Sequence, residues 1–161
     1  ETSVILIGRS GQIFGELAVI DGLPRSATAV AQDATILCTL SREAFSYHTR
    51  RIPQFSLNFL QELSTRLRYS TRQMDSFASL DVPQRLARKL LELAQSYGRL
   101  DTDGVCIPLT LTQTDLASLI GATRESINKS LRDFRRRQWI RLDQGCITLL
   151  DPDALRTQVS A

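Results

Sequence analysis

One helical stretch carries a heptad repeat, which constrains the fold more than any other feature of the sequence. Its seam residues follow one another at spacings of 3, 4, 3, 4 and 3; they are Leu60, Leu63, Leu67, Ser70, Met74 and Phe77. This repeat favours a parallel two-stranded coiled coil, with ordinary packing on a core as the alternative. The polar position Ser70, followed by Thr71, is typical of a residue kept for register or for a ligand.

The length and composition indicate a folded chain that is not a large enzyme. With 161 residues, 42% hydrophobic and 23% charged, it can form one ordinary domain or two small ones. Its apolar runs are too short to cross a membrane. His48 and the three cysteines, Cys38, Cys106 and Cys146, form neither a zinc-ligand spacing nor a catalytic motif. So few cysteines favour buried thiols in a reducing cytoplasm, and a pair meeting in space is the alternative.

The net charge of +3 is unevenly distributed. Residues 83–161 carry twelve basic and nine acidic side chains, whereas the preceding residues sum to zero. Residues 124–141 contain seven basic and two acidic side chains. Clustered positive charge is typical of a protein that binds a polyanion, and a solvated helix face is the alternative.

The two halves of the chain predict different secondary structure. Residues 3–40 are rich in Val, Ile and Thr and are interrupted by glycines, which predicts antiparallel strands at 4–7, 13–14, 26–31 and 34–40. Ser41 begins a helix, and Ile52-Pro53 interrupts it before the long helix.

In the C-terminal half, Pro83 begins another helix, and Asp103-Gly104 predicts a hairpin turn. A short helix runs from its cap at Thr112 to Gly121, and Thr123 caps a second helix. A hairpin of residues 139–150 follows, so this half is predicted to be a winged helix-turn-helix.

Two motifs resemble one family, the cyclic-AMP receptor/FNR-type transcription regulators of bacteria. Residues 14–29 resemble the family's phosphate-binding cassette, and residues 111–140 resemble its DNA-binding module. The resemblance implies an α+β fold that begins partway through an antiparallel β-roll. It places a partial cyclic-nucleotide-binding β-roll at 1–52, a dimerisation helix at 53–80 and a winged helix-turn-helix DNA-binding domain at 81–161.

The cassette carries groups that suit a cyclic nucleotide. Arg25 offers a planar fork and Ser26 a hydroxyl for a phosphate, while Glu16 can accept from a sugar hydroxyl. The resemblance implies these roles, and it assigns the purine to Ser70 and Thr71, whose order is Thr-Ser in the cyclic-AMP receptors. The alternative is a ligand-free relative in which Glu16 and Arg25 pair across a turn. The expected cyclic-nucleotide site comprises Gly15, Glu16, Leu17, Arg25, Ser26, Ala27, Ser70 and Thr71.

The second helix of the DNA-binding module carries the expected base-reading side chains. Arg124 and Glu125 match the family's Arg-Glu pair, with arginine on a guanine edge and glutamate on a cytosine amino group. Lys129 stands where the cyclic-AMP receptors have arginine, which relaxes recognition there because lysine lacks the fork. Hydroxyls at the helix N-termini are candidates for phosphate contacts. The expected DNA-binding set is Thr112, Thr123, Arg124, Glu125, Ser126, Asn128 and Lys129.

The sequence therefore predicts a cytoplasmic, homodimeric transcription regulator that is not an enzyme and that binds a palindromic operator in double-stranded DNA. Its expected effector is cAMP, and the resemblance adds RNA polymerase as a partner. One alternative is a regulator of the same fold with another effector or none. The other is a cyclic-nucleotide-binding module whose basic half docks a protein instead of reading DNA.

Overall fold

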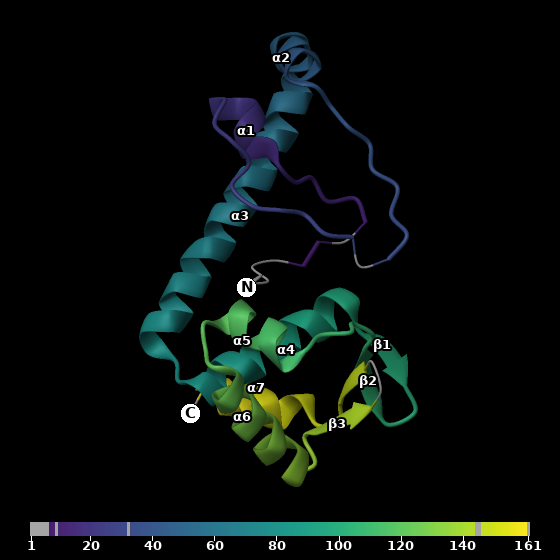
Figure 1. Cartoon of the computed structure of the whole chain (residues 1–161), viewed down its shortest axis with the longest axis vertical. Coiled ribbons are helices and arrows are strands. Elements are labelled where there is room, and N and C mark those ends of the chain that lie inside the picture. The colour runs from purple at the N-terminus through teal and green to yellow at the C-terminus, as the bar shows by residue number, and fades with distance from the viewer. Residues whose placement is uncertain (1–6, 9, 32, 144–145, 161) are drawn as a thin grey trace. The chain divides into compact units, whose positions relative to one another are not determined.

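The computed structural model describes residues 7–160 except residues 9, 32, 144 and 145. It divides the chain into two compact units, one formed by residues 8–70 and the other built on residues 71–160. Figure 1 shows both units and labels most of their helices and strands.

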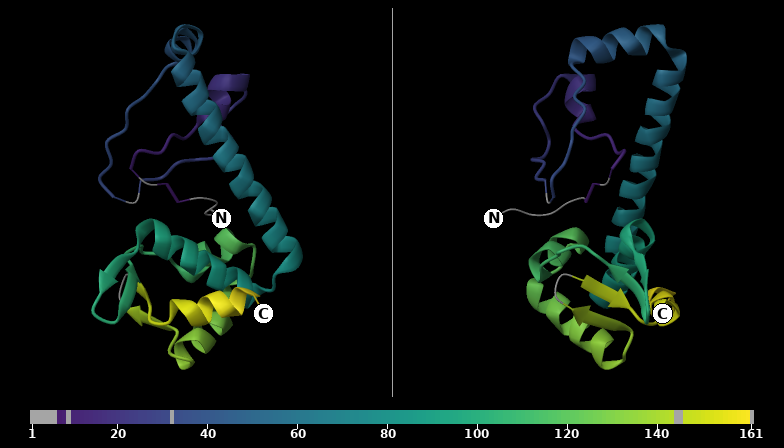
Figure 2. Two further views of the ribbon diagram at one scale, coloured as in Figure 1. Left: turned by 180° about the vertical axis from the view of Figure 1, so that it is seen from behind. Right: turned by 90° about the vertical axis from the view of Figure 1, so that its right-hand side faces the viewer.

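Among its described residues, the N-terminal unit has helices as its only regular secondary structure. It contains α1 (Glu16–Asp21), α2 (Arg42–Arg51) and the N-terminal part of α3 (Pro53–Ser79). As predicted, Ser41 caps α2, its side chain accepting a hydrogen bond from the Ala44 amide at 3.2 Å. The chain turns a sharp corner between α2 and α3 (Figure 2), where Phe45 lies against Phe55 and Phe59 with ring centroids 5.7 and 5.0 Å away.

The strands predicted at 13–14, 26–31 and 34–40 are not strands in the structure, and residues 4–6 lie outside the described residues. A strand needs a neighbour for its backbone N–H and C=O groups, and none of these three segments pairs with another among the described residues. Their apolar side chains stand in solvent, Ile36 being 97% exposed. Strand-forming composition without a pairing partner was the cause of the wrong prediction. The sequence also gave no indication of α1.

The long helix predicted from the heptad repeat is present. Helix α3 begins at Pro53, directly after the predicted break, and continues for 27 residues. Much of its seam faces solvent in the single chain: Leu60 is 58% exposed, Leu67 69% and Met74 71%. This stripe therefore presents exposed apolar side chains in the single chain.

The C-terminal unit combines four helices with an antiparallel sheet. The helices are α4 (Val82–Tyr97), α5 (Gln113–Ile120), α6 (Arg124–Arg136) and α7 (Pro152–Ser160). The strands β1 (Arg99–Asp101), β2 (Gly104–Ile107), β3 (Ile140–Asp143) and β4 (Cys146–Leu149) lie in the order β1-β2-β4-β3. The helix at Pro83, the hairpin at Asp103-Gly104 and the closing hairpin are confirmed, whereas α7 was not predicted. The α+β fold with a C-terminal winged helix-turn-helix is therefore confirmed.

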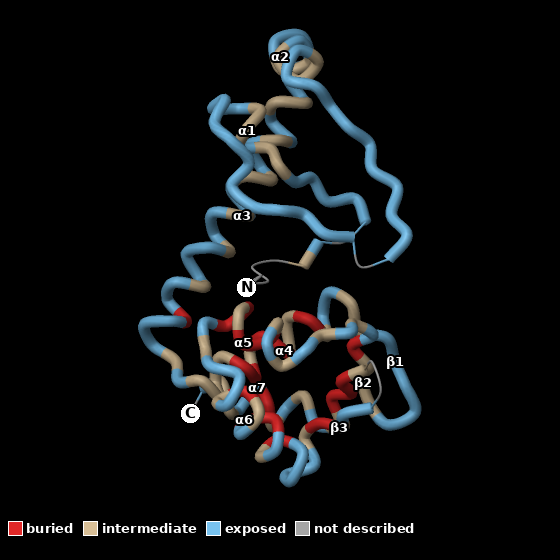
Figure 3. The backbone as a smooth tube through the Cα atoms, viewed as in Figure 1, coloured by how far each residue is buried: buried red, intermediate tan, exposed pale blue. Residues whose placement is uncertain are grey.

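Most of the buried core belongs to this unit (Figure 3). Helix α4 contributes Leu86 and Leu90, and α6 contributes Ile127 and Phe134, all at most 1% exposed. One face of the sheet adds Ile107, Ile140, Ile147 and Leu149. This core supports α5 and α6 and fixes which face of each helix remains in solvent.

Two of the three cysteines form a disulfide. Cys106 of β2 and Cys146 of β4 are bonded, and Cys38 is free and exposed. The expectation of buried thiols was therefore wrong. The alternative of a pair meeting in space holds, because the β2–β4 ladder brings together residues separated by 40 positions in sequence.

The turn of the helix-turn-helix is built as its sequence predicts. Thr112 and Asp115 form a reciprocal capping box at the start of α5, and Gly121 ends that helix in the left-handed region at φ 60°. Thr123 then caps α6 through a hydrogen bond from the Ser126 amide. These short-range interactions set the two helices one tight turn apart.

The last turns of α3 pack on this unit. The ring of Phe77 lies beside Gly121, and the Arg85 guanidinium stands 5.5 Å from the ring centroid. A hydrogen bond from Arg88 to the hydroxyl of buried Ser76 adds a second link to α4. Phe77, expected only in the dimer seam, thus also contacts the helix-turn-helix turn.

Replacing Gly121 with alanine is expected to lower the free energy of unfolding by about 1–2 kcal/mol, since a left-handed conformation is costly for other residues. The new Cβ would also lie 3.0 Å from Cε1 of Phe77. Urea denaturation measures the loss. In a Phe77→Ala background the same substitution should cost less, because only the backbone strain remains; an equal cost in both backgrounds would contradict the ring contact.

Candidate nucleic-acid interface and effector cassette

Helix α6 presents a polar face to solvent. Its buried side is formed by Ile127, Ser130, Leu131 and Phe134. On the other side Arg124, Glu125 and Lys129 are exposed, while Asn128 and Ser126 are half-buried at its margin. The structure therefore brings the predicted base-reading side chains together on the first turns of one exposed helix. Protruding polar groups at this end of a helix can reach base edges in a major groove.

The cations of residues 124–141 differ in their surroundings. Asp133 pairs with Arg136 and, at 2.8 Å, with Arg137, whose guanidinium also lies over the Trp139 ring. Among the described residues no ion pair involves Arg124, Lys129, Arg132 or Arg135. These four unpaired cations therefore carry the positive field of α6.

The sequence places Arg141 in the same cationic cluster as the arginines of α6, but in the structure its charge is offset by nearby carboxylates. On the outer face of the sheet it pairs with Asp143 at 2.7 Å, Asp103 at 2.8 Å and Asp101 at 3.3 Å. Hydrogen bonds to Asp143 and Asp103 raise the pKa of Arg141 above its usual value. This face of the sheet thus carries three carboxylates around one cation, one from the wing hairpin of β3 and β4 and two from β1 and the turn that follows it, which makes the face acidic.

The capping hydroxyls are already engaged within the helix ends. Thr112 Oγ1 lies 2.7 Å from the Asp115 carboxylate, which can only accept its proton. A phosphate contact by this hydroxyl would therefore require the threonine to turn away from Asp115. Thr123 Oγ1 and Ser126 Oγ lie 2.9 Å apart, so one of them donates to the other and the second keeps a proton for an outside acceptor.

In the cassette, Arg25 folds back over Gly15. Its Nη1 donates a hydrogen bond to the Gly15 carbonyl, and Gly15 adopts φ 73° as the N-terminal cap of α1. A Cβ at Gly15 would overlap the guanidinium, lying 2.1 Å from Nη1. Nη1 is the far end of a flexible side chain that could move aside, so it is the left-handed backbone conformation that favours glycine at this position.

Glu16 takes a different partner from the one expected. Its carboxylate pairs at 2.9 Å with Arg66 of α3, which also bonds Glu62 at 3.0 Å and the Ile13 carbonyl. The structure forms no Glu16–Arg25 ion pair, in contrast to the ligand-free alternative. Arg66 is therefore a further candidate residue of this cassette, although it lies outside the sequence motif. Its position four residues before Ser70, on the same helix face, was the available signal.

The remaining cassette residues are exposed. Leu17 lies on α1 with 48% of its surface in solvent, and Ser26 and Ala27 lie in the exposed segment that follows Arg25. Ser70 and Thr71 are exposed on α3. Gly15, Glu16 and Arg25 are thus brought together around the start of α1, whereas Leu17, Ser26 and Ala27 make no enclosed site there.

The fold and these two sites define a class of protein, a sensor domain joined to a winged helix-turn-helix. Residues 1–48 match the cyclic nucleotide-binding domain, and residues 84–158 match the Crp-like helix-turn-helix domain. The chain belongs to the CRP/FNR family of transcription regulators. This agrees with the prediction that it is not an enzyme.

Among its relatives is the CRP-like cAMP-activated global transcriptional regulator of Mycobacterium tuberculosis, 34% identical over 155 residues, which are 96% of this chain and 69% of that protein. The global nitrogen regulator of Synechocystis is 31% identical over 160 residues, 98% of this chain and 71% of that protein. A solved CooA mutant from Carboxydothermus hydrogenoformans is similar with a TM-score of 0.66 and 26% identity, over 71% of this chain and 53% of that one. The chain thus spans about half the length of that solved protein.

None of the described helices is both long enough and apolar enough to cross a membrane.

Proposed function

We propose that this chain acts as a homodimer that binds a palindromic operator in double-stranded DNA and responds to cyclic AMP. The observation that carries the DNA-binding role is α6, which exposes Arg124, Glu125 and Lys129 together on the side opposite its buried face. Arginine can form a forked contact with guanine, and glutamate can accept from cytosine. Thr112, Thr123 and Ser126 would lie near phosphates, and Asn128 near the edge of the contact.

The dimer follows from the exposed seam of α3. Leu60, Leu67 and Met74 place apolar side chains in solvent at seam positions seven residues apart, which a second α3 of the same spacing can cover. Two-fold symmetry of the protein then requires two operator half-sites about one helical turn apart. RNA polymerase as a further partner and the cytoplasm as location belong to this proposal, through the resemblance to bacterial regulators.

The effector site would use the cassette around α1. Arg25 and Ser26 would hold the cyclic phosphate and Glu16 the ribose hydroxyl, with Gly15, Leu17 and Ala27 shaping the turn and Ser70 and Thr71 meeting the purine. Release of Arg25 from the Gly15 carbonyl would free its fork for phosphate. Effector binding would favour the arrangement in which both reading helices fit DNA.

A regulator with another effector is the second candidate. It is favoured by the Arg66–Glu16 pair, which occupies the carboxylate assigned to ribose, and by the Ser-Thr order at Ser70. The printed names of the relatives also differ in effector, from a cAMP-activated regulator to a global nitrogen regulator.

Calorimetric titration of the full-length protein with cyclic AMP distinguishes the two. Arg25→Ala is expected to weaken binding roughly 10- to 150-fold, because a bound phosphate would lose a charge-assisted hydrogen-bond partner. Arg50→Ala, at an exposed arginine of α2 outside the cassette, is the matched control and should bind normally. Absence of heat with the wild-type protein at millimolar nucleotide would exclude cyclic AMP as the effector.

A further inference from the structure

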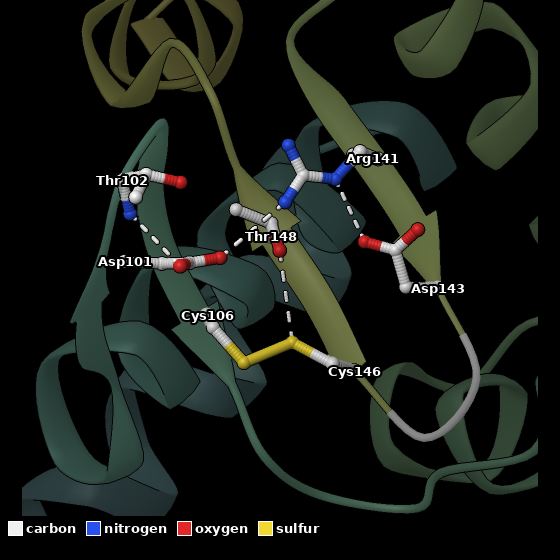
Figure 4. The surroundings of a disulfide bond; sticks show 7 residues. All are labelled: Asp101, Thr102, Cys106, Arg141, Asp143, Cys146 and Thr148. Carbon is white, nitrogen blue, oxygen red and sulfur yellow. Dashed lines mark hydrogen bonds and ion pairs between the residues drawn. A yellow bond between two sulfur atoms is a disulfide. The ribbon is translucent and has the colours of Figure 1, made fainter.

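The disulfide joins β2 and β4 on the face of the four-stranded sheet that is turned away from the core (Figure 4). Cys106 of β2 stands opposite Thr148 of β4, and Cys146 precedes Thr148 by two residues on the same face. The Cα atoms of the two cysteines are 6.1 Å apart, a separation that a disulfide spans without moving either strand. The opposite face of these strands carries the core residues Ile107 and Ile147.

The disulfide closes a long covalent loop, because its two cysteines are 40 positions apart in sequence. Its two cysteines enclose α5, the turn at Gly121, α6 and β3, so the covalent loop contains the whole helix-turn-helix. Cys146 is also the first residue of β4, the second strand of the wing hairpin. Closing the disulfide therefore fastens the wing to β2 and restricts the unfolded chain across the DNA-binding segment.

Both sulfur-bearing residues can be reached from solvent. Cys106 and Cys146 are half-buried, unlike the core residues beside them, and Cys146 Sγ lies 3.6 Å from the hydroxyl of Thr148. Arg141 and Asp143 lie on the same face of the sheet, since they stand opposite Thr148 and Cys146 in the ladder. The disulfide thus lies on the polar face of the sheet, beside the buried hydroxyl of Thr148, and not among the apolar core residues of the opposite face.

We infer that Cys106 and Cys146 form a reversible dithiol–disulfide site that is oxidised by small-molecule disulfides and that tightens DNA binding when closed. One cysteine thiolate attacks the small disulfide, forming a mixed disulfide and releasing one small thiol. The second cysteine thiolate then attacks the first cysteine sulfur, which closes the Cys106–Cys146 bond and releases the second small thiol. The two cysteines lose two electrons and two protons in total, and the small disulfide gains them. The effect on DNA rests on the proposed function, whereas the sulfur chemistry does not.

The sulfur chemistry is tested on the purified full chain with oxidised and reduced glutathione. After alkylation of free thiols, mass spectrometry of the oxidised protein should show a Cys106–Cys146 linked peptide, and reduction should remove it. Reduction should lower the melting temperature of the C-terminal unit by about 10–20 °C, because the closed loop is long. Cys38→Ser is the matched control and should keep this redox-dependent shift, while Cys106→Ser should abolish it. Alkylation of both Cys106 and Cys146 after equilibration with excess oxidised glutathione would overturn the inference.

The DNA effect is tested on a palindromic operator selected by the wild-type protein. Reduction should weaken operator binding roughly 2- to 10-fold, since the wing and reading helix become less preorganised, and Cys106→Ser should match the reduced protein under both conditions. Equal operator affinity in the oxidised and reduced wild type would overturn the regulatory part. A protein that binds no DNA in either state would instead contradict the proposed function, and the linked peptide and melting shift would still decide the sulfur chemistry.

Discussion

Replacing both Leu63 and Leu67 with alanine is expected to convert a dimeric protein into monomers. If α3 pairs with its copy along the heptad seam, each substitution leaves a cavity that costs about 2–5 kcal/mol. Leu67 is 69% exposed in the single chain, so a partner helix could bury much of its apolar surface. Sedimentation equilibrium over a range of micromolar concentrations measures the change.

Gln61→Ala is the matched control for this experiment. Gln61 is exposed on α3 one position after a seam residue and away from the seam, so the variant should remain dimeric. Circular dichroism should show that the double variant keeps its helices, which separates loss of association from loss of folding. Wild-type protein that sediments as a monomer at high micromolar concentration would contradict a stable dimer.

Replacing Arg124 with alanine is expected to cost about 1–3 kcal/mol of binding energy on the cognate operator, roughly a 5- to 150-fold loss of affinity. The side chain is exposed on the first turn of α6 and has no ion-pair partner among the described residues. If it bonds a guanine edge, its removal should matter far less on scrambled DNA. Titrations of operator and scrambled DNA measure both losses.

Arg135→Ala provides the comparison. Arg135 is exposed in the last turn of α6, about 16 Å from Arg124 along the helix axis, and Asp133 pairs with its neighbours Arg136 and Arg137 instead. If Arg135 contacts a phosphate, its removal should weaken all DNA sequences similarly and reduce the salt slope by about one counterion. Equal losses on both DNAs for Arg124→Ala would mean that α6 contacts the backbone without reading bases.

The helix ends were predictable because their determinants are local. Ser41, Thr112 and Thr123 each accept a hydrogen bond from the amide three residues onward, and Gly121 supplies the left-handed residue that ends α5. These interactions span one turn and need no knowledge of the rest of the fold. The helix-turn-helix, and the exposed face of α6 with Arg124 and Lys129, could therefore be placed from sequence.

The N-terminal unit shows where such reasoning fails. Residues 26–31 and 34–40 have a strand-forming composition, but strand formation depends on a neighbouring segment in register. The described residues supply no such neighbour, so these segments remain unpaired. The Glu16–Arg66 ion pair was also beyond the sequence, because its two residues lie 50 positions apart and meet only when α1 lies against α3.

The sequence by itself determined the long helix, the capped helix-turn-helix and the membership of the chain in its family, because spacing and capping act within a few residues. Tertiary structure alone decided which distant side chains meet. It placed Arg141 among three aspartates and so removed its charge from the α6 surface. It also joined Cys106 to Cys146 through the register of β2 on β4. The physical reason is that strand pairing is a property of two segments, and no single segment carries the register of its partner.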